Sequence, residues 1–166
     1  MEVTYLYEYS RAVRRRFAEK LSQLPWEDVE KNREASFYSM KNVLLHVIDN
    51  EDWIVNYAIF ERSKEYTRKK AEEYTNMNMI LDHLSDVEKK TIAYFSSVGK
   101  EELEKQVSFE LSSGKKFELT VEECLIQSFT EQLYHLGEII CLLWQEDIEP
   151  PPMQWFYNRP NLSTAK

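Results

Sequence analysis

The chain has 166 residues, of which 43% are hydrophobic and 30% charged, and its formal net charge is −8. The length fits one domain, residues 1–166, with a core of its own. The negative charge argues against nucleic acid or an anionic membrane surface as partner, because both are bound by clustered Lys and Arg.

The first predicted helix covers residues 2–23, where apolar side chains recur every three or four positions. This stripe consists of Leu6, Tyr9, Val13, Phe17 and Leu21. Pro25 marks the end of the helix, and residues 25–38 are expected to form a loop.

The one basic cluster, Arg14-Arg15-Arg16, lies on this first helix. Glu8 and Glu19 stand nearby at helical spacing. We interpret the cluster as a solvated helix face rather than a phosphate site.

Two further helices are expected in the middle of the chain. Ser39 is a candidate N-cap for a helix that ends near Arg62, and the charged residues 61–73 connect it to the next. The third helix is expected over residues 76–98, followed by Gly99 as a terminator. Both segments carry apolar stripes of helical period.

The hydrophobic period then changes from helical to alternating, which predicts a short β-hairpin with a turn at 112–115. The alternating residues are Val107, Phe109, Leu111, Phe117, Leu119 and Val121. Thr120 and Glu123 have the spacing of a capping box, so the last helix is expected from there to about Glu146. Because this helix is apolar on more than one face, it should lie in the middle of a bundle.

The elements together predict an all-α fold, a four-helix bundle with a short β-hairpin before the last helix. The tail, residues 149–166, begins with Glu and three Pro and cannot be helical there. Its aromatic residues Trp155, Phe156 and Tyr157 are expected to pack back on the bundle.

Two of the three histidines lie among apolar residues in the middle of different predicted helices. His46 belongs to the second helix, and His135 to the last, where Glu131 precedes it by four residues and shares its face. Two imidazoles and one carboxylate form a three-ligand metal site that leaves positions open for water or substrate. Such a site suits Zn, Ni, Fe or Mn, and the residues do not choose among them.

The alternative is that these histidines are hydrogen-bonded core residues, with Glu131 as an ordinary partner. His83 lies at the edge of the third helix stripe and is expected at the surface or behind the site. No nucleophilic triad is evident, so the sequence assigns no catalytic residue. A metal-free binding module would instead use interior aromatic residues, for which the candidates are Trp53, Tyr57, Tyr134 and Trp144. A structural dimer without chemistry is the third hypothesis.

The two cysteines, Cys124 and Cys141, stand 17 positions apart on the last predicted helix. That spacing is about 25 Å, too long for a disulfide. With no apolar signal region and no run of about 18 apolar residues, we expect a reduced, cytoplasmic protein without a membrane span. Cys124 is a candidate reactive thiol only if it opens onto the same cavity as the histidines; otherwise it is a buried, inert Cys.

Two short motifs and the order of elements resemble a known family. The first motif is His46 with Glu51-Asp52-Trp53 after it, and the second is His135-x-Gly137-Glu138-Ile139. The second is similar to the His-x-Gly-Gln-Ile of the DinB/YfiT-like superfamily. With the helix order and hairpin, the resemblance covers about residues 3 to 157.

The resemblance implies a four-helix bundle, often a homodimer, that holds nickel or zinc. The family ligands are one His of the second helix and two of the last; His46 and His135 match two of them, and Glu131 stands at the third position. Characterised relatives imply S-transfer with a low-molecular-weight thiol, in which the metal stabilises the thiolate. The expected function is therefore metal-dependent chemistry on such a thiol or another small molecule.

Overall fold

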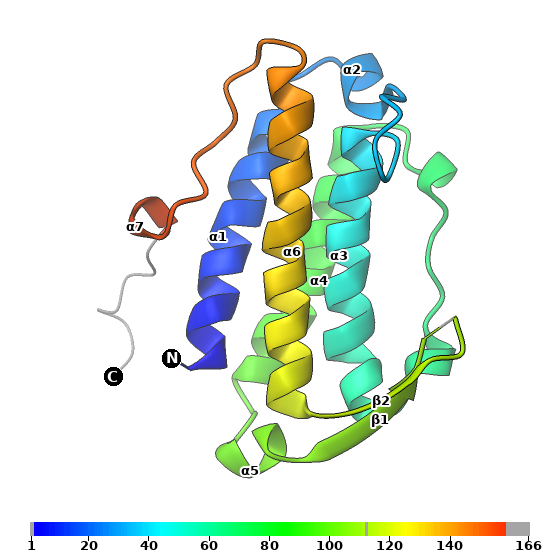
Figure 1. Ribbon diagram of the computed structural model, residues 1–166, viewed down its shortest axis with the longest axis vertical. Helices are drawn as coiled ribbons and strands as arrows, with labels where there is room; N and C mark the ends of the chain where they lie inside the picture. Colours follow the sequence, from blue (N-terminus) through cyan, green and yellow to red (C-terminus); the bar gives the residue numbers. More distant parts are fainter. Residues whose placement is uncertain (1, 112, 159–166) are drawn as a thin grey trace.

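The computed structural model describes residues 2–111 and 113–158, and in them four long helices run side by side (Figure 1). These are α1 (Val3–Ser22), α3 (Met40–Asn56), α4 (Met77–Phe95) and α6 (Val121–Trp144). The predicted bundle, with a hairpin before its last helix, is confirmed. No helix among these residues is long and apolar enough to cross a membrane.

The shorter elements lie at the ends of the bundle and along its side (Figure 1). They are α2 (Trp26–Glu30), the 3₁₀ turns η1 (Ala58–Phe60), η2 (Ser63–Glu65) and η3 (Ala71–Glu73), α5 (Lys100–Leu103), β1 (Gln106–Glu110), β2 (Lys116–Thr120) and α7 (Trp155–Asn158). Helix α2 replaces part of the expected loop: α1 ends at Ser22, and Pro25 is the N-cap of α2. Helix α3 ends at Asn56, about six residues earlier than expected, and η1 follows it.

Helix α6 packs against both α1 and α3, which agrees with its apolar residues on more than one face (Figure 1). Its fully buried residues include Leu125 and Phe129 toward the hairpin end and Leu136 and Ile139 further along. Two apolar clusters fill the bundle, and α6 contributes to both.

Side-chain caps fix where α3 and α6 begin. The Ser39 hydroxyl accepts a hydrogen bond from the Asn42 N–H at 3.2 Å. Thr120 accepts one from the Glu123 N–H at 3.1 Å, and the Glu123 carboxylate accepts from the Thr120 N–H at 2.7 Å. Both predicted caps are confirmed, so the phase of each helix, and with it the direction of its histidine, is set locally.

The hairpin pairs β1 and β2 antiparallel, with Val107 opposite Leu119 and Phe109 opposite Phe117. It lies across one end of the bundle, beside the start of α6 (Figure 1). Gly114 in the turn has a φ of +81°, a conformation that side chains with a Cβ rarely adopt.

The interpretation of Arg14-Arg15-Arg16 as a solvated face is wrong for Arg14, whose side chain is fully buried. It forms ion pairs with Glu51 of α3 and with Glu88 of α4, the latter at 3.1 Å. It also donates a hydrogen bond to Gln132 of α6 at 2.8 Å. One buried arginine of α1 thus connects the four long helices.

The described part of the tail runs back along α1 (Figure 1). Trp155 packs against Tyr5 and Tyr9 with ring centroids 5.3 and 4.6 Å apart, and Arg16 donates to the Tyr157 carbonyl at 3.1 Å. Phe156 and Tyr157 remain largely exposed. Residues 159–166 of the tail prediction lie outside the described residues.

Candidate metal site

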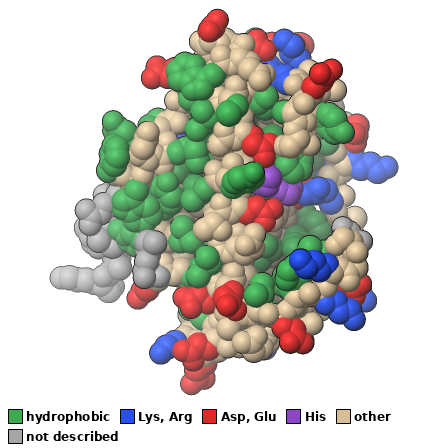
Figure 2. All heavy atoms as spheres, viewed as in Figure 1, with side chains coloured by type: hydrophobic (Ala, Val, Ile, Leu, Met, Phe, Trp, Pro, Cys, Tyr) green, Lys and Arg blue, Asp and Glu red, His purple; other side chains and the backbone are tan. Residues whose placement is uncertain are grey.

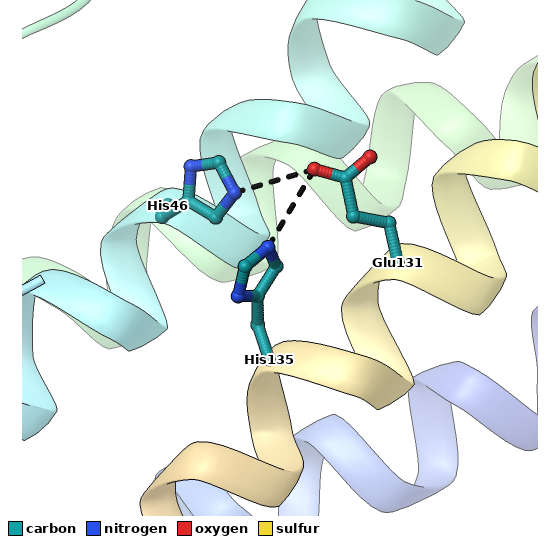
Figure 3. Close-up of side chains that lie close together, drawn as sticks. All are labelled: His46, Glu131 and His135. Carbon is teal, nitrogen blue, oxygen red and sulfur yellow. Dashed lines mark ion pairs between the residues drawn. The ribbon is translucent and has the colours of Figure 1, made fainter. Parts of the chain in front are cut away.

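The structure brings together the three residues that the sequence singled out (Figure 3). His46 extends from α3, while Glu131 and His135 extend from adjacent turns of α6, and both rings face one carboxylate oxygen (Figure 3). Glu131 Oε1 lies 3.4 Å from His46 Nε2 and 3.7 Å from His135 Nε2. The two imidazole rings are nearly perpendicular, with centroids 4.5 Å apart.

Both separations are too long for ordinary hydrogen bonds, and they lie in or just above the range found between ligand atoms of one ion. Ligand atoms at about 2.0–2.2 Å from one tetrahedral ion lie about 3.3–3.6 Å apart. Both distances exceed the roughly 2.7–3.2 Å of an ordinary N–H···O bond. Within the described part of the chain, His46 Nε2 is buried and has no hydrogen-bond partner. Buried polar atoms are normally satisfied, so this nitrogen points to a ligand.

The environment keeps Glu131 ionised. The neighbouring His46 is the main influence and lowers the pKa of the Glu131 carboxyl, Gln127 lowers it further, and partial burial opposes both effects. Gln127 donates to Glu131 Oε2 at 3.1 Å, which leaves Oε1 toward the rings. An ionised carboxylate beside two imidazole nitrogens is a donor set that first-row divalent metals accept.

A pocket of about 1110 Å³ adjoins this group, with His46 and Glu131 in its wall. Its apolar side is formed by α3 and the hairpin and includes Trp53, Phe109 and Phe117. The segment between η1 and η3 adds polar and cationic residues, namely Ser63, Lys64, Tyr66 and Arg68. Figure 2 shows histidine atoms reaching the surface on the viewed face, close to acidic side chains.

The hypothesis of an aromatic interior holds only in part. Trp53 lines the pocket and packs edge-on against Phe109, with ring centroids 5.4 Å apart. Tyr134 is 72% exposed and Trp144 55% exposed, so neither belongs to an interior binding site. Both lie on the outer side of α6, because a helix that is apolar on more than one face still turns one face to solvent.

The third histidine, His83, lies outside the three-residue group, in a smaller pocket of about 360 Å³. Its Nδ1 is 2.6 Å from the Tyr74 hydroxyl, and its Nε2 is 3.9 Å from Asp49. Asp49 lines both pockets and is held by Arg68 at 2.8 Å and by the Tyr66 hydroxyl at 3.1 Å. Burial disfavours the charged form of both groups. It lowers the pKa of His83 despite the nearby Asp49, and it raises the pKa of Asp49 despite the nearby Arg68.

Cys124 is 1% exposed, and burial raises the pKa of its thiol to about 11. It is not among the described residues that line the large pocket. The alternative of a buried, inert cysteine is therefore the one that the structure supports. Cys141, by contrast, is exposed.

Sequence reasoning missed two residues that touch the histidines. Phe37, from the connection between α2 and α3, stacks on His46, and Glu138, one turn after His135, approaches its Nδ1. The position of Glu138 three residues after a candidate ligand was a usable signal. Nothing in the pattern of residues 31–39 indicated that Phe37 would lie against a histidine of α3.

Comparisons with known proteins agree with this architecture. The profile of the DinB family matches residues 1–161. The crystal structure of a DinB-like protein from Bacillus subtilis matches with a TM-score of 0.66 at 18% identity, over 92% of this chain and 96% of that one. A DinB-like protein from Bacillus cereus ATCC 10987 matches with a TM-score of 0.61 at 15% identity, over 90% of this chain and 91% of that one. No curated protein matches the chain.

The fold and site define a helical bundle with a group of two histidines and one glutamate that could hold a metal. The chain belongs to the DinB family.

Proposed function

We propose that this protein binds one divalent transition metal through His46, Glu131 and His135 and acts on a small molecule held in the adjoining pocket. The observation that carries the proposal is the convergence of one carboxylate oxygen and two imidazole nitrogens from two helices. The buried His46 Nε2, which has no hydrogen-bond partner among the described residues, supports it. Three protein ligands leave coordination positions for substrate, as in catalytic rather than structural zinc sites.

When bound, the metal would supply a Lewis acid that lowers the pKa of a coordinated thiol or water. The protein's own residues would orient the substrate. Trp53, Phe109 and Phe117 offer apolar surface in the pocket, and Lys64 offers a cation. A pocket of about 1110 Å³ is large enough for a drug-sized molecule. Low-molecular-weight thiols are the substrate class that we favour, on the family resemblance.

Glu131 gives the proposed site one positive charge less than three histidines would. A carboxylate is also a harder ligand than imidazole, so harder ions such as Mn and Fe should compete better here than at a three-histidine site. The site should accordingly bind Zn and Ni but discriminate less strongly against Mn.

Chelator-stripped protein tests this proposal by competition with a metal-binding dye. Loss of a residue that only hydrogen-bonds to a metal ligand weakens metal affinity roughly 10–100-fold. His46→Ala and His135→Ala remove ligands themselves, so each should weaken Zn²⁺ affinity by at least that factor. His83→Ala is the matched control, because it removes the one histidine outside the group, and it should leave the affinity unchanged. Equal effects of the three variants, or no binding by the wild type, would contradict the proposal.

A second candidate function is metal-free binding of an apolar small molecule, which the aromatic wall of the pocket favours. The probe 8-anilinonaphthalene-1-sulfonate tests it in the presence of EDTA. Phe109→Ala should lower the probe's affinity, and the exposed Trp144 supplies the control Trp144→Ala. If both variants lower it equally, the probe reports exposed surface, and this second function fails.

A further inference from the structure

Glu138 and the connection between α2 and α3 form a second layer around the candidate ligands. His135 Nδ1 lies 2.7 Å from Glu138 Oε1, and the other carboxylate oxygen of Glu138 accepts a hydrogen bond from Ser36. We infer that Glu138, anchored by Ser36, is a positioning residue that fixes the tautomer and orientation of His135 for metal binding. This inference rests on the proposed function.

The hydrogen-bond chemistry allows one neutral tautomer of His135. A carboxylate only accepts hydrogen bonds, so the short contact with Glu138 places the ring proton on Nδ1. The lone pair is then on Nε2, the atom that lies 3.7 Å from Glu131 Oε1. A carboxylate on the far nitrogen also makes the imidazole a stronger donor, the arrangement common behind histidine ligands of metals.

The anchor connects segments distant in the chain. Ser36 and Glu138 are separated by 102 positions, and their hydrogen bond ties the connection between α2 and α3 to the C-terminal half of α6. The same connection is held at its other end by Arg33, which pairs with Glu146 of α6 at 3.0 Å. Glu138 is therefore restrained from both sides, by its own helix and by the connection.

Phe37, next to Ser36, supports both rings. It stacks on His46 with centroids 4.3 Å apart and planes 23° apart, and it meets His135 edge-on at 5.2 Å. These contacts restrict rotation of both imidazoles. The Ser36–Glu138 hydrogen bond holds the connection that carries Phe37, so one anchor orients both histidines.

The first test reads the tautomer of His135 in metal-free protein by long-range ¹H–¹⁵N NMR. The chain has three histidines, and the variants His46→Ala and His83→Ala assign the signals. The wild type should show His135 with a protonated Nδ1 and a bare Nε2. Glu138→Ala should shift the ring toward a mixture of tautomers, whereas Glu138→Gln, which keeps an acceptor oxygen, should retain most of the Nδ1–H form. A wild-type ring that is protonated on Nε2, or a ring unchanged in Glu138→Ala, would refute the positioning role.

The second test measures Zn²⁺ affinity by dye competition. Glu138→Ala and Glu138→Gln should weaken binding roughly 10–100-fold, Glu138→Ala more strongly, and Ser36→Ala should weaken it by a smaller factor. Glu122→Gln, on the first turn of the same helix, is the matched control and should have no effect.

The two tests separate this inference from the proposed function. If the wild type binds zinc and both Glu138 variants bind it equally well, the positioning role is wrong and the metal site stands. If the wild type binds no metal, the proposed function fails, while the NMR experiment still decides the tautomer.

Discussion

The buried Arg14 offers a prediction whose size can be worked from the structure. Arg14→Leu removes two ion pairs, to Glu51 and Glu88, and one hydrogen bond, to Gln132, all among side chains that are at most 1% exposed. Breaking a buried ion pair from one side costs about 3–5 kcal/mol. Glu51 keeps hydrogen bonds from Thr91 at 2.8 Å and Gln132 at 3.0 Å, so we expect a loss near the lower end, about 3 kcal/mol.

Urea denaturation followed by circular dichroism measures this loss, with EDTA present so that bound metal adds nothing to stability. The matched control is Arg16→Leu, two positions along α1, because the Arg16 guanidinium donates an exposed hydrogen bond to the backbone carbonyl of Tyr157. The control should lose less than about 1 kcal/mol. If Arg14→Leu loses no more free energy of unfolding than the control, the buried network does not have the role assigned to it.

Arginine side chains hold the pKa of Glu88 below its ordinary value, although burial opposes them. The ionised Glu88 therefore stabilises the fold above the ordinary carboxyl pKa, and this stabilisation is lost as the pH falls through the lowered pKa. Urea titrations at acid pH should show that the free energy of unfolding depends less on pH in Arg14→Leu than in the wild type. Glu131→His should retain or tighten Zn²⁺ and Ni²⁺ binding in dye competition, and complete loss of metal would contradict its assignment as a ligand. Cys141 is exposed and should react with Ellman's reagent in the native protein. Cys124, whose thiol pKa is raised to about 11, should react only after unfolding, and equal reaction rates of the two thiols would contradict this. Ser39→Ala should cost about 1 kcal/mol in urea denaturation through the lost cap of α3, and an unchanged midpoint would count against it.

Much of the fold could be predicted because its signals are local. The caps at Ser39 and Thr120, the helical stripes and the alternation around Gly114 each depend on residues within a few positions. Arg14 was misjudged because three arginines in a row are typical of an exposed face, although Arg14 follows Tyr7 and Ser10 on the buried side of α1. The buried acids that accept it come from α3 and α4, and no local pattern pairs them with it.

In the candidate site, too, the local features could be predicted from the sequence and the contacts between distant segments could not. His46, Glu131 and His135 could be singled out because each lies at helical spacing on an apolar face, and the structure brings them together. The contacts of Phe37 and of Ser36 depend on how an irregular connection folds over the helices, which periodicity does not determine. The exposure of Tyr134 and Trp144 could not be predicted either, because α6 carries apolar residues on more than one face and the pattern does not say which of them faces solvent.

The central claim is that His46, Glu131 and His135 bind one metal ion. A crystal of the zinc-loaded protein, measured on both sides of the zinc absorption edge, tests it most directly through the anomalous difference map. We predict one strong peak per chain, about 2.0–2.2 Å from a donor atom of each of the three residues. A map without a peak there, or with its main peak beside Asp49 and His83, would contradict the account.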